Sequence, residues 1–259
     1  MGKEVIVSRE GNIGRVTVNR PKQLNAMNSA TRSAIVEAFE QFGSDPEVRA
    51  IILTGAGEKS FIAGADLAEF AASGELDSVK MRNEWHMTEV AAACPTPIIA
   101  MVDGFCLGGG MELAMACDLR VASDDATFGM PEVKVGIPSV IEAALLPRLV
   151  GAGRARALVY TGESISAADA EQWGLVDRVV PGVELDDTTQ TWVRAIGAAG
   201  PKAIRLQKSL IRQWEAMPLD DAIQAGVGCF TSAYDSDEPR RRMQAFLDRK
   251  SSPQRNREG

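Results

Sequence analysis

Apolar, β-branched residues are concentrated in two short stretches at the start of the chain. These stretches are residues 3–9 and 13–19, and Glu10, Gly11 and Asn12 separate them. Glycine and asparagine between two such runs are typical of a tight turn between antiparallel strands. The chain is therefore predicted to begin with a β-hairpin.

The spacing of apolar residues then becomes helical and afterwards alternates. Apolar residues three to four positions apart predict a helix over residues 28–42, with Asn28 or Ser29 near its N-cap. The elements predicted after it are strand 50–54, strand 98–103, helix 109–117, strand 119–123 and a helix within 145–161. Alternation of strands and helices is typical of an α/β core.

After Pro181 the apolar residues occur only at helical spacing. The three segments with this spacing are 188–199, 201–214 and 218–234. We therefore predict two parts, a core over residues 1–190 that contains the chemistry and a C-terminal helical region over residues 191–259.

Composition narrows the class of protein. A chain of 259 residues with 45% hydrophobic and 24% charged residues can bury a large core without disulfides. The formal net charge of −7 disfavours nucleic acid as a partner. The four cysteines lack C-x-x-C spacing, so we expect reduced thiols and no metal site. No apolar run approaches the ~20 residues of a membrane span, and the start lacks an apolar signal segment, so we expect a cytoplasmic protein.

A glycine run near the middle of the chain contains the candidate chemistry. Gly108, Gly109 and Gly110 precede a predicted helix, so a ligand can approach their N–H groups at the positive end of the helix. Glu112 lies in the first turn of that helix, and Glu132 follows a loop that can return to the same cleft. Two carboxyl groups beside an oxyanion site indicate acid/base chemistry next to a carbonyl group. Each feature alone has an ordinary explanation, such as the preference of acids for a first helical turn.

Six segments together resemble one known family. They are N-R-P-K-Q-L-N-A at 19–26, I-L-T-G-A-G-E-K-S-F-I-A-G-A-D-L at 52–67, A-M-V-D-G-F-C-L-G-G-G-M-E-L-A at 100–114, A-T-F-G-M-P-E at 126–132, T-G-E-S-I-S-A-A-D-A at 161–170 and G-L-V-D-R-V-V at 174–180. The chain is similar over nearly its whole length to the crotonase, or enoyl-CoA hydratase/isomerase, superfamily. The resemblance implies an α/β fold with a spiral core of ββα repeats and C-terminal helices that form homotrimers or homohexamers. No such repeat is legible in the sequence.

The resemblance further implies an enoyl-CoA hydratase, which adds water to a 2-enoyl-CoA. Glu112 matches a water-positioning base and Glu132 a proton donor, although the sequence does not assign which carboxyl group holds the proton. Ala65 and Gly109 match the two residues whose N–H groups stabilise the thioester oxygen. No metal or redox cofactor is implied, because coenzyme A enters as part of the acyl-CoA substrate.

The same resemblance implies seven positions that contact coenzyme A. They are Ala63 and Asp66 at the adenine end, Lys22, Leu24 and Ala26 along the approach, and Phe246 and Arg249 from a neighbouring subunit. Lys22 is equally well explained as a solvated surface lysine, and Phe246 as a core residue.

A few other polar or aromatic residues invite a functional interpretation. His86 has no nucleophile or metal partner nearby in the sequence and is expected to be structural. Trp85 and Met87 either border the acyl pocket or pack in the core. Asp118 is expected to satisfy backbone donors.

The segment after Glu132 departs from the family pattern. Most hydratases that this chain resembles have P-G-A-G-G here, whereas this chain has Ser139, Val140, Ile141 and Glu142. The segment borders the acyl group in the family, so the departure leaves the reaction type open. Glu142 is expected to be a surface acid rather than a third pocket acid. The arginines in D-E-P-R-R-R-M also replace a common Glu-Gly.

Other functions stay open on the sequence alone. The nearest is another crotonase-type reaction on an acyl-CoA, namely double-bond isomerisation, retro-aldol cleavage, decarboxylation or dehalogenation. A non-catalytic, RNA-binding relative is disfavoured by the net negative charge. A dinucleotide-binding oxidoreductase is disfavoured because G-x-G-x-x-G with a later acid is missing.

Overall fold

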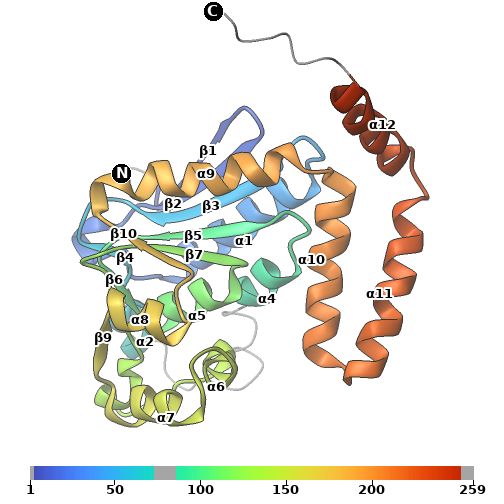
Figure 1. Ribbon diagram of the computed structural model, residues 1–259. Helices are drawn as coiled ribbons and strands as arrows, with labels where there is room; N and C mark the ends of the chain where they lie inside the picture. Colours follow the sequence, from blue (N-terminus) through green and yellow to red (C-terminus); the bar gives the residue numbers. More distant parts are fainter. Residues whose placement is uncertain (1–2, 73–85, 252–259) are drawn as a thin grey trace, which may run out of the picture. The chain divides into compact units, whose positions relative to one another are not determined.

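The computed structural model, which describes residues 3–72 and 86–251, begins with the predicted β-hairpin (Figure 1). β1 (Val5–Glu10) pairs antiparallel with β2 (Ile13–Val18) in the register Glu10 opposite Ile13. Gly11 lies in the turn with φ of +59°, a conformation that costs glycine little. This part of the prediction is confirmed.

The hairpin is one edge of a six-stranded sheet. The strand order is β1-β2-β3-β5-β7-β10, and every pair after the hairpin is parallel. The four inner and terminal strands are β3 (Ala50–Gly55), β5 (Ile98–Val102), β7 (Leu119–Ser123) and β10 (Arg178–Val180). A continuous apolar run such as β3 fits a parallel sheet that is covered on both faces.

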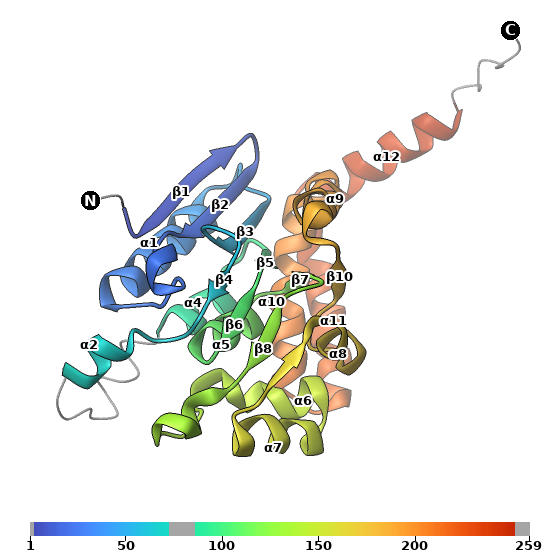
Figure 2. The same ribbon diagram turned by 90° about the vertical axis from the view of Figure 1, so that its left-hand side faces the viewer.

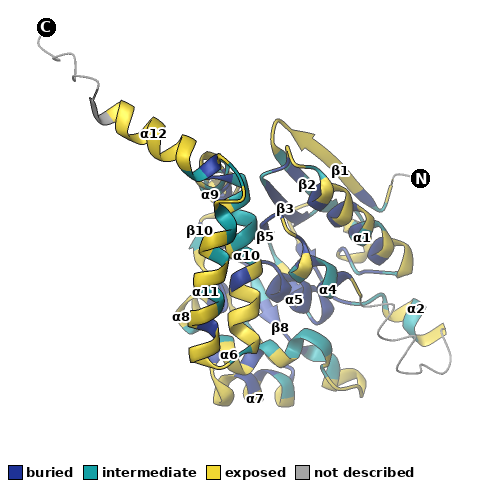
Figure 3. Cartoon of the chain, turned by 90° about the vertical axis from the view of Figure 1, so that its right-hand side faces the viewer, coloured by how far each residue is buried: buried dark blue, intermediate teal, exposed yellow. Residues whose placement is uncertain are grey.

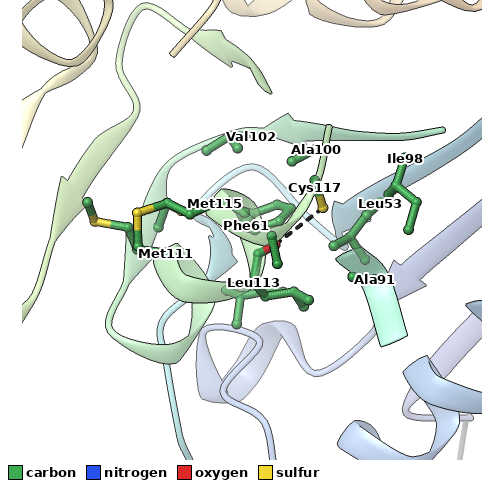
Figure 4. Packing of buried hydrophobic residues seen from close by; sticks show 14 of the residues in the cluster. Leu53, Phe61, Ala91, Ile98, Ala100, Val102, Met111, Leu113, Met115 and Cys117 are labelled. Atoms are coloured by element: carbon green, nitrogen blue, oxygen red, sulfur yellow. Dashed lines mark hydrogen bonds between the residues drawn. The ribbon is translucent and has the colours of Figure 1, made fainter. Parts of the chain in front are cut away.

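Two apolar clusters lie on the two faces of this sheet. Ile51 and Leu53 belong to the larger cluster together with Phe39, and the alternate residues Ala50 and Ile52 belong to the other. α1 (Ser29–Ser44), α4 (His86–Ala93) and α5 (Gly109–Ala116) contribute to the larger cluster, and α9 (Leu185–Ala198) contributes to the smaller. Figure 4 shows the α5 side chains inside the larger cluster. Because successive side chains of a strand point to opposite faces, the sheet packs against helices on both of its faces.

A second sheet of four short strands was not anticipated. Its order is β4 (Ser60–Ile62), β6 (Phe105–Leu107), β8 (Thr127–Gly129) and β9 (Ser164–Ser166). β4, β6 and β8 are parallel neighbours, and β9 is antiparallel to β8 (Figure 2). Strands of three residues are too short to show a period-two pattern, which explains why the sequence did not indicate them.

The two sheets share a repeating ββα unit. Two copies are β3-β4-α2, with α2 at Leu67–Ala72, and β5-β6-α5, and a third copy, β7-β8-η2, has the 3₁₀ turn η2 (Pro131–Val135) in place of the α-helix. In each copy the first strand joins the six-stranded sheet and the second joins the four-stranded sheet. The repeat is therefore one of structure, not of sequence.

Shorter elements complete the first unit. They are η1 (Pro21–Gln23), η3 (Ile141–Leu145), α6 (Leu146–Val150), α7 (Ala152–Thr161), α8 (Ala167–Trp173) and η4 (Gly182–Glu184). Asn28 is the N-cap of α1 and accepts a hydrogen bond from the Thr31 N–H at 2.8 Å, as predicted. None of the described helices is both long and apolar enough to cross a membrane.

The chain divides into two units, Met1–Ile196 and Gly197–Gly259. The division falls inside α9, a few residues after the predicted boundary at residue 190. The second unit contains α10 (Pro201–Ala216), α11 (Leu219–Ala233) and α12 (Glu238–Ser251).

Contacts at the start of α12 hold the second unit together. The Glu238 carboxylate is buried and accepts hydrogen bonds from the Lys202 and Ala203 N–H groups, which lie in the first turn of α10. The Arg242 guanidinium donates to the carbonyl oxygens of Ala198 and Ala199. Arg242 is one of the arginines that replace the common Glu-Gly, and it provides hydrogen-bond donors for carbonyl oxygens at the end of α9.

Candidate active site

A cavity of about 560 Å³ lies beside the carboxyl ends of β4, β6 and β8. Neighbouring parallel strands end at the same edge of a sheet, so the segments that follow them converge. The segments that line the cavity are 63–68 after β4, 108–112 after β6 and 131–140 after β8, together with the loop 23–26 and Phe70. Four of the predicted positions, Ala65, Gly109, Glu112 and Glu132, thereby share one site.

The backbones after β4 and β6 approach each other closely. Gly64 has φ of +103°, and a Cβ there would lie 3.2 Å from the Leu107 carbonyl oxygen and 3.7 Å from the Gly109 nitrogen. Gly108, the N-cap of α5, has φ of +51° and ψ of −125°. Glycine is thus required for both the conformation and the close approach.

The N–H groups of Ala65 and Gly109 are available on the cavity side. Met27 pairs with Ala65 by donating its N–H to the Gly64 carbonyl and accepting from the Asp66 N–H. In an extended segment the intervening N–H of Ala65 points the opposite way. Gly109 is the first residue of α5, where an N–H has no partner within the helix. Two backbone N–H groups thus lie on adjacent segments, and paired donors of this kind can bind an oxyanion.

Glu112 is buried at the base of the cavity. All eight residues of α5 are buried (Figure 3), and Glu112 is 4% exposed. Its Oε1 has no hydrogen-bond partner among the described residues. Burial, with the nearby charges of Glu132 and Glu142, raises the pKa of Glu112 to about 8, although the N–H groups of Ala143 and Val140 oppose this rise. Glu112 therefore keeps its proton at neutral pH.

Glu132 reaches the same cavity from the 3₁₀ turn η2. Its Oε2 accepts a hydrogen bond from the Ser139 hydroxyl at 2.7 Å. A Cβ on Gly108 would lie 2.5 Å from its Oε1, so a larger residue at position 108 would displace this carboxylate. Ser139, which replaces a glycine of the family pattern, thus orients Glu132 directly.

The rest of the unusual segment surrounds Glu112. Val140 lines the cavity, and Ile141 has φ of +53°, which is rare for a β-branched residue. Glu142 is half-buried and accepts a hydrogen bond from the Thr88 hydroxyl, while its buried Oε2 lacks a hydrogen-bond partner in the described part of the chain. The expectation that Glu142 is a surface acid was wrong, because η3 packs against α5.

Most of the predicted coenzyme A positions in the first unit line the cavity. They are Leu24, Ala26, Ala63 and Asp66. Lys22 is exposed in η1 and is not part of the lining. A hydrogen bond from the Arg20 guanidinium, 2.8 Å long, lowers the pKa of Asp66, so this carboxylate is held as an anion.

Two residues that shape this wall were missed in the sequence. The Arg20 guanidinium contacts both Asp66 and the Ala26 carbonyl oxygen. Asn25 is fully buried with φ of +57°, and its side chain donates to the Ala56 and Ser60 carbonyl oxygens. Asparagine tolerates positive φ better than most residues, so the L-N-A triplet was the available signal.

The remaining candidates lie elsewhere. Phe246 and Arg249 are exposed on α12 in the second unit, and their role stays a prediction. His86 is exposed beside Glu89, and Met87 is buried in the core, whereas Trp85 lies outside the described residues. Asp118 accepts a hydrogen bond from the Ile98 N–H at 2.7 Å, as expected.

Similarity to known proteins identifies the family. The sequence profile described as enoyl-CoA hydratase/isomerase matches residues 8–256. The chain belongs to the enoyl-CoA hydratase/isomerase family. It is 38% identical to a short-chain-enoyl-CoA hydratase of Clostridium acetobutylicum over 95% of both chains, and 36% identical to a crotonyl-CoA hydratase of Syntrophomonas wolfei over 96% and 97% of the two chains.

Solved structures in this family share the fold. An enoyl-CoA hydratase of Bacillus anthracis superposes with a TM-score of 0.88 at 33% identity, over 95% of this chain and 96% of that chain. One of Geobacillus kaustophilus gives the same TM-score at 35% identity over 98% of both. The predicted crotonase-type spiral is thus confirmed. Within the described residues, no three His, Cys, Asp or Glu side chains form a group that could hold a metal ion.

The burial of Glu112 predicts a pH-dependent stability. Because its pKa rises from 4.5 to about 8 on folding, the folded chain keeps a proton that the unfolded chain releases, and the free energy of unfolding falls as pH rises through this window. Glu112→Gln removes that effect. We expect its Tm to exceed that of wild type by a few degrees at pH 8 and to match it at pH 4.5.

Calorimetry at both pH values would check this expectation. Glu40→Gln, at an exposed position of α1, is the control and should shift neither value. A Tm difference of the same size at both pH values would show that Glu112 is not the proton-linked group.

Proposed function

We propose that this chain is an enoyl-CoA hydratase that reversibly adds water to a 2-enoyl-CoA to give a 3-hydroxyacyl-CoA. The observation that supports this most directly is the convergence of Glu112 and Glu132 beside the N–H groups of Ala65 and Gly109 in one cavity. The names of the two relatives above point to the same reaction. The altered segment after Glu132 leaves both carboxyl groups in the cavity.

The oxyanion site serves the thioester carbonyl. Attack of water at C3 moves electron density onto the thioester oxygen, which becomes enolate-like. The N–H groups of Ala65 and Gly109 hold that oxygen and stabilise the developing charge. The apolar cavity excludes water around these donors and so strengthens the interaction.

The two glutamates divide the proton transfers. Glu132 takes a proton from the water whose oxygen bonds to C3, and Glu112 gives its proton to C2. The product gains one water, and the two carboxyl groups exchange protonation states, which solvent restores after release. The burial of Glu112 supports this assignment, which reverses the roles that the resemblance suggested.

Coenzyme A enters as the handle of the substrate, with no separate cofactor. Leu24, Ala26 and Ala63 offer an apolar wall for it, and the Asp66 carboxylate offers a hydrogen-bond acceptor for the adenine amino group. We assign a contact with a phosphate to Lys22, which is exposed in η1 next to the lining residue Gln23. We also propose a cytoplasmic location, supported by four cysteines that are all free thiols.

The second unit supplies the assembly surface. Five large apolar residues of α11 and its end are exposed at helical spacing, namely Leu219, Ile223, Val227, Phe230 and Tyr234. An apolar stripe of this length is costly in water. We propose that other copies of this chain bury the stripe, in a homotrimer or in a homohexamer of two trimers.

Loss of either carboxylate should abolish hydration. We expect Glu112→Gln and Glu132→Gln to lower kcat for crotonyl-CoA by about 10²- to 10⁴-fold, because each removes one proton-transfer group. Loss of enoyl absorbance measures the rate, and mass spectrometry identifies the hydrated product. Glu40→Gln should retain wild-type activity. A wild-type enzyme that binds crotonyl-CoA and longer enoyl-CoAs without hydrating any of them would overturn the proposal in favour of another crotonase-type reaction.

The pH profile distinguishes the two possible roles of Glu112. If Glu112 must be protonated, kcat/KM falls as pH rises through about 8. Initial rates between pH 5 and pH 10 would show this limb, with buffers matched in ionic strength. A rise in kcat/KM as pH increases through 8 would instead show that Glu112 acts as the base, and it would overturn its assignment as the proton donor.

Disruption of the α11 stripe should dissociate the assembly. Phe230→Glu places a charge within the exposed stripe, and we expect light scattering after size exclusion to show monomers. Val183→Glu is the matched control, since Val183 is 94% exposed in η4 of the first unit. An unchanged mass for Phe230→Glu would show that another surface holds the copies together.

A further inference from the structure

The turn that covers Glu112 brings a third carboxyl group to the site. η3 packs against α5, and the N–H groups of Val140 and Ala143 act to lower the pKa of Glu112. Glu142 lies between these two residues in the chain. Its Oε2 is buried without a hydrogen-bond partner among the described residues, as is Oε1 of Glu112. Two buried carboxyl oxygens therefore lie on contacting elements, and each lacks a direct donor.

The backbone of this turn is held in an unfavourable conformation. Ile141 is β-branched and has φ of +53°, a backbone conformation that is costly for such a residue. Ile141 also packs against the main apolar cluster. Such a conformation persists only where the surrounding structure enforces it. Here it lies between Val140, which lines the cavity, and Glu142, which is bonded to Thr88 on α4.

The charged groups around Glu142 are mostly acidic. Glu112 faces it from α5, and Glu89 acts on it from α4, where His86 lies 3.3 Å from the Glu89 carboxylate. Glu132, from η2, acts on Glu112. Arg148 on α6, which also packs against η3, is exposed. Burial raises the pKa of Glu142, and the Thr88 hydroxyl and the Glu142 N–H are the donors that oppose this rise.

We propose that Glu142 is a positioning residue that holds the proton on Glu112. This rests on the proposed hydratase function and deepens it, because Glu142 acts through Glu112 and not on the substrate. Two carboxyl groups that are close and shielded from water do not both ionise easily. Burial raises the pKa of Glu142 as well, but hydrogen bonds from the Thr88 hydroxyl and from its own N–H oppose that rise. Glu112 is the more deeply buried of the two and has its pKa raised to about 8, so the proton stays on Glu112, where C2 needs it.

The test is the pH profile of kcat/KM for crotonyl-CoA in wild type, Glu142→Gln, Glu142→Asp and Glu40→Gln. Glutamine keeps the size of Glu142 and removes its charge. We expect its alkaline limb to move to lower pH by roughly one unit, with kcat at pH 6 within about threefold of wild type. Glu142→Asp keeps the charge, so its alkaline limb should stay close to that of wild type. Glu40→Gln should leave the alkaline limb unchanged.

The outcomes separate this inference from the function on which it rests. Wild-type hydration with an unmoved limb in Glu142→Gln would overturn the role of Glu142 alone. A raised KM with an unmoved limb would also overturn it and make Glu142 a residue that contacts substrate. Absence of hydration in wild type would overturn the proposed function itself. If Glu142→Gln lowers the Tm strongly, the pH profile of Glu142→Asp decides the question. A purely structural role would not make the position of the alkaline limb depend on the charge at position 142.

Discussion

The parallel pairing of three short strands is the constraint on which the site depends. β4, β6 and β8 lie side by side with Phe105 paired to Ser60 and to Thr127, so their last residues end at one edge. Ala65, Gly109 and Glu132 each follow one of these strands by two to three residues. A shift of one residue in either pairing would turn these groups to opposite sides. The backbone hydrogen bonds of the small sheet therefore set the geometry of the proposed oxyanion site and of the two glutamates.

The larger sheet makes this arrangement possible by isolating Glu112 from water. α5 is buried along its full length because the six-stranded sheet, α1 and α4 share one apolar cluster with it. A carboxyl group in the first turn of such a helix loses solvation, and it keeps its proton at neutral pH despite the helix dipole. The same burial makes the fold less stable above the ordinary pKa of glutamate. The proposed role of Glu112 as proton donor and the stability of the fold are thus in opposition at this one residue.

Sequence patterns predicted the larger elements and missed the smaller ones for a physical reason. The hairpin, α1, β3, β5, α5, β7 and the C-terminal helices have enough residues to show a period. The three-residue strands do not, although they form the edge where the site lies. Glycine positions and the two glutamates could be found from motifs, since Gly64 and Gly108 need positive φ. Motifs could not reveal the contacts made by Arg20, Asn25, Ser139 and Glu142. These contacts join segments that are distant in the chain or depend on the path of a turn.

The segment 139–142 shows how the surroundings of a family site can change while the proposed catalytic pair, Glu112 and Glu132, is retained. Glycines at these positions would give Glu132 and Glu112 no side-chain neighbours from this turn. Here Ser139 donates to Glu132 at 2.7 Å, and Glu142 adds a charge that acts on Glu112. Ile141 lies between these neighbours with an unfavourable positive φ. On one side of it Val140 lines the cavity, and on the other Glu142 accepts a hydrogen bond from Thr88. Ser139 thus orients one glutamate, and Glu142 acts on the pKa of the other, while both glutamates are retained.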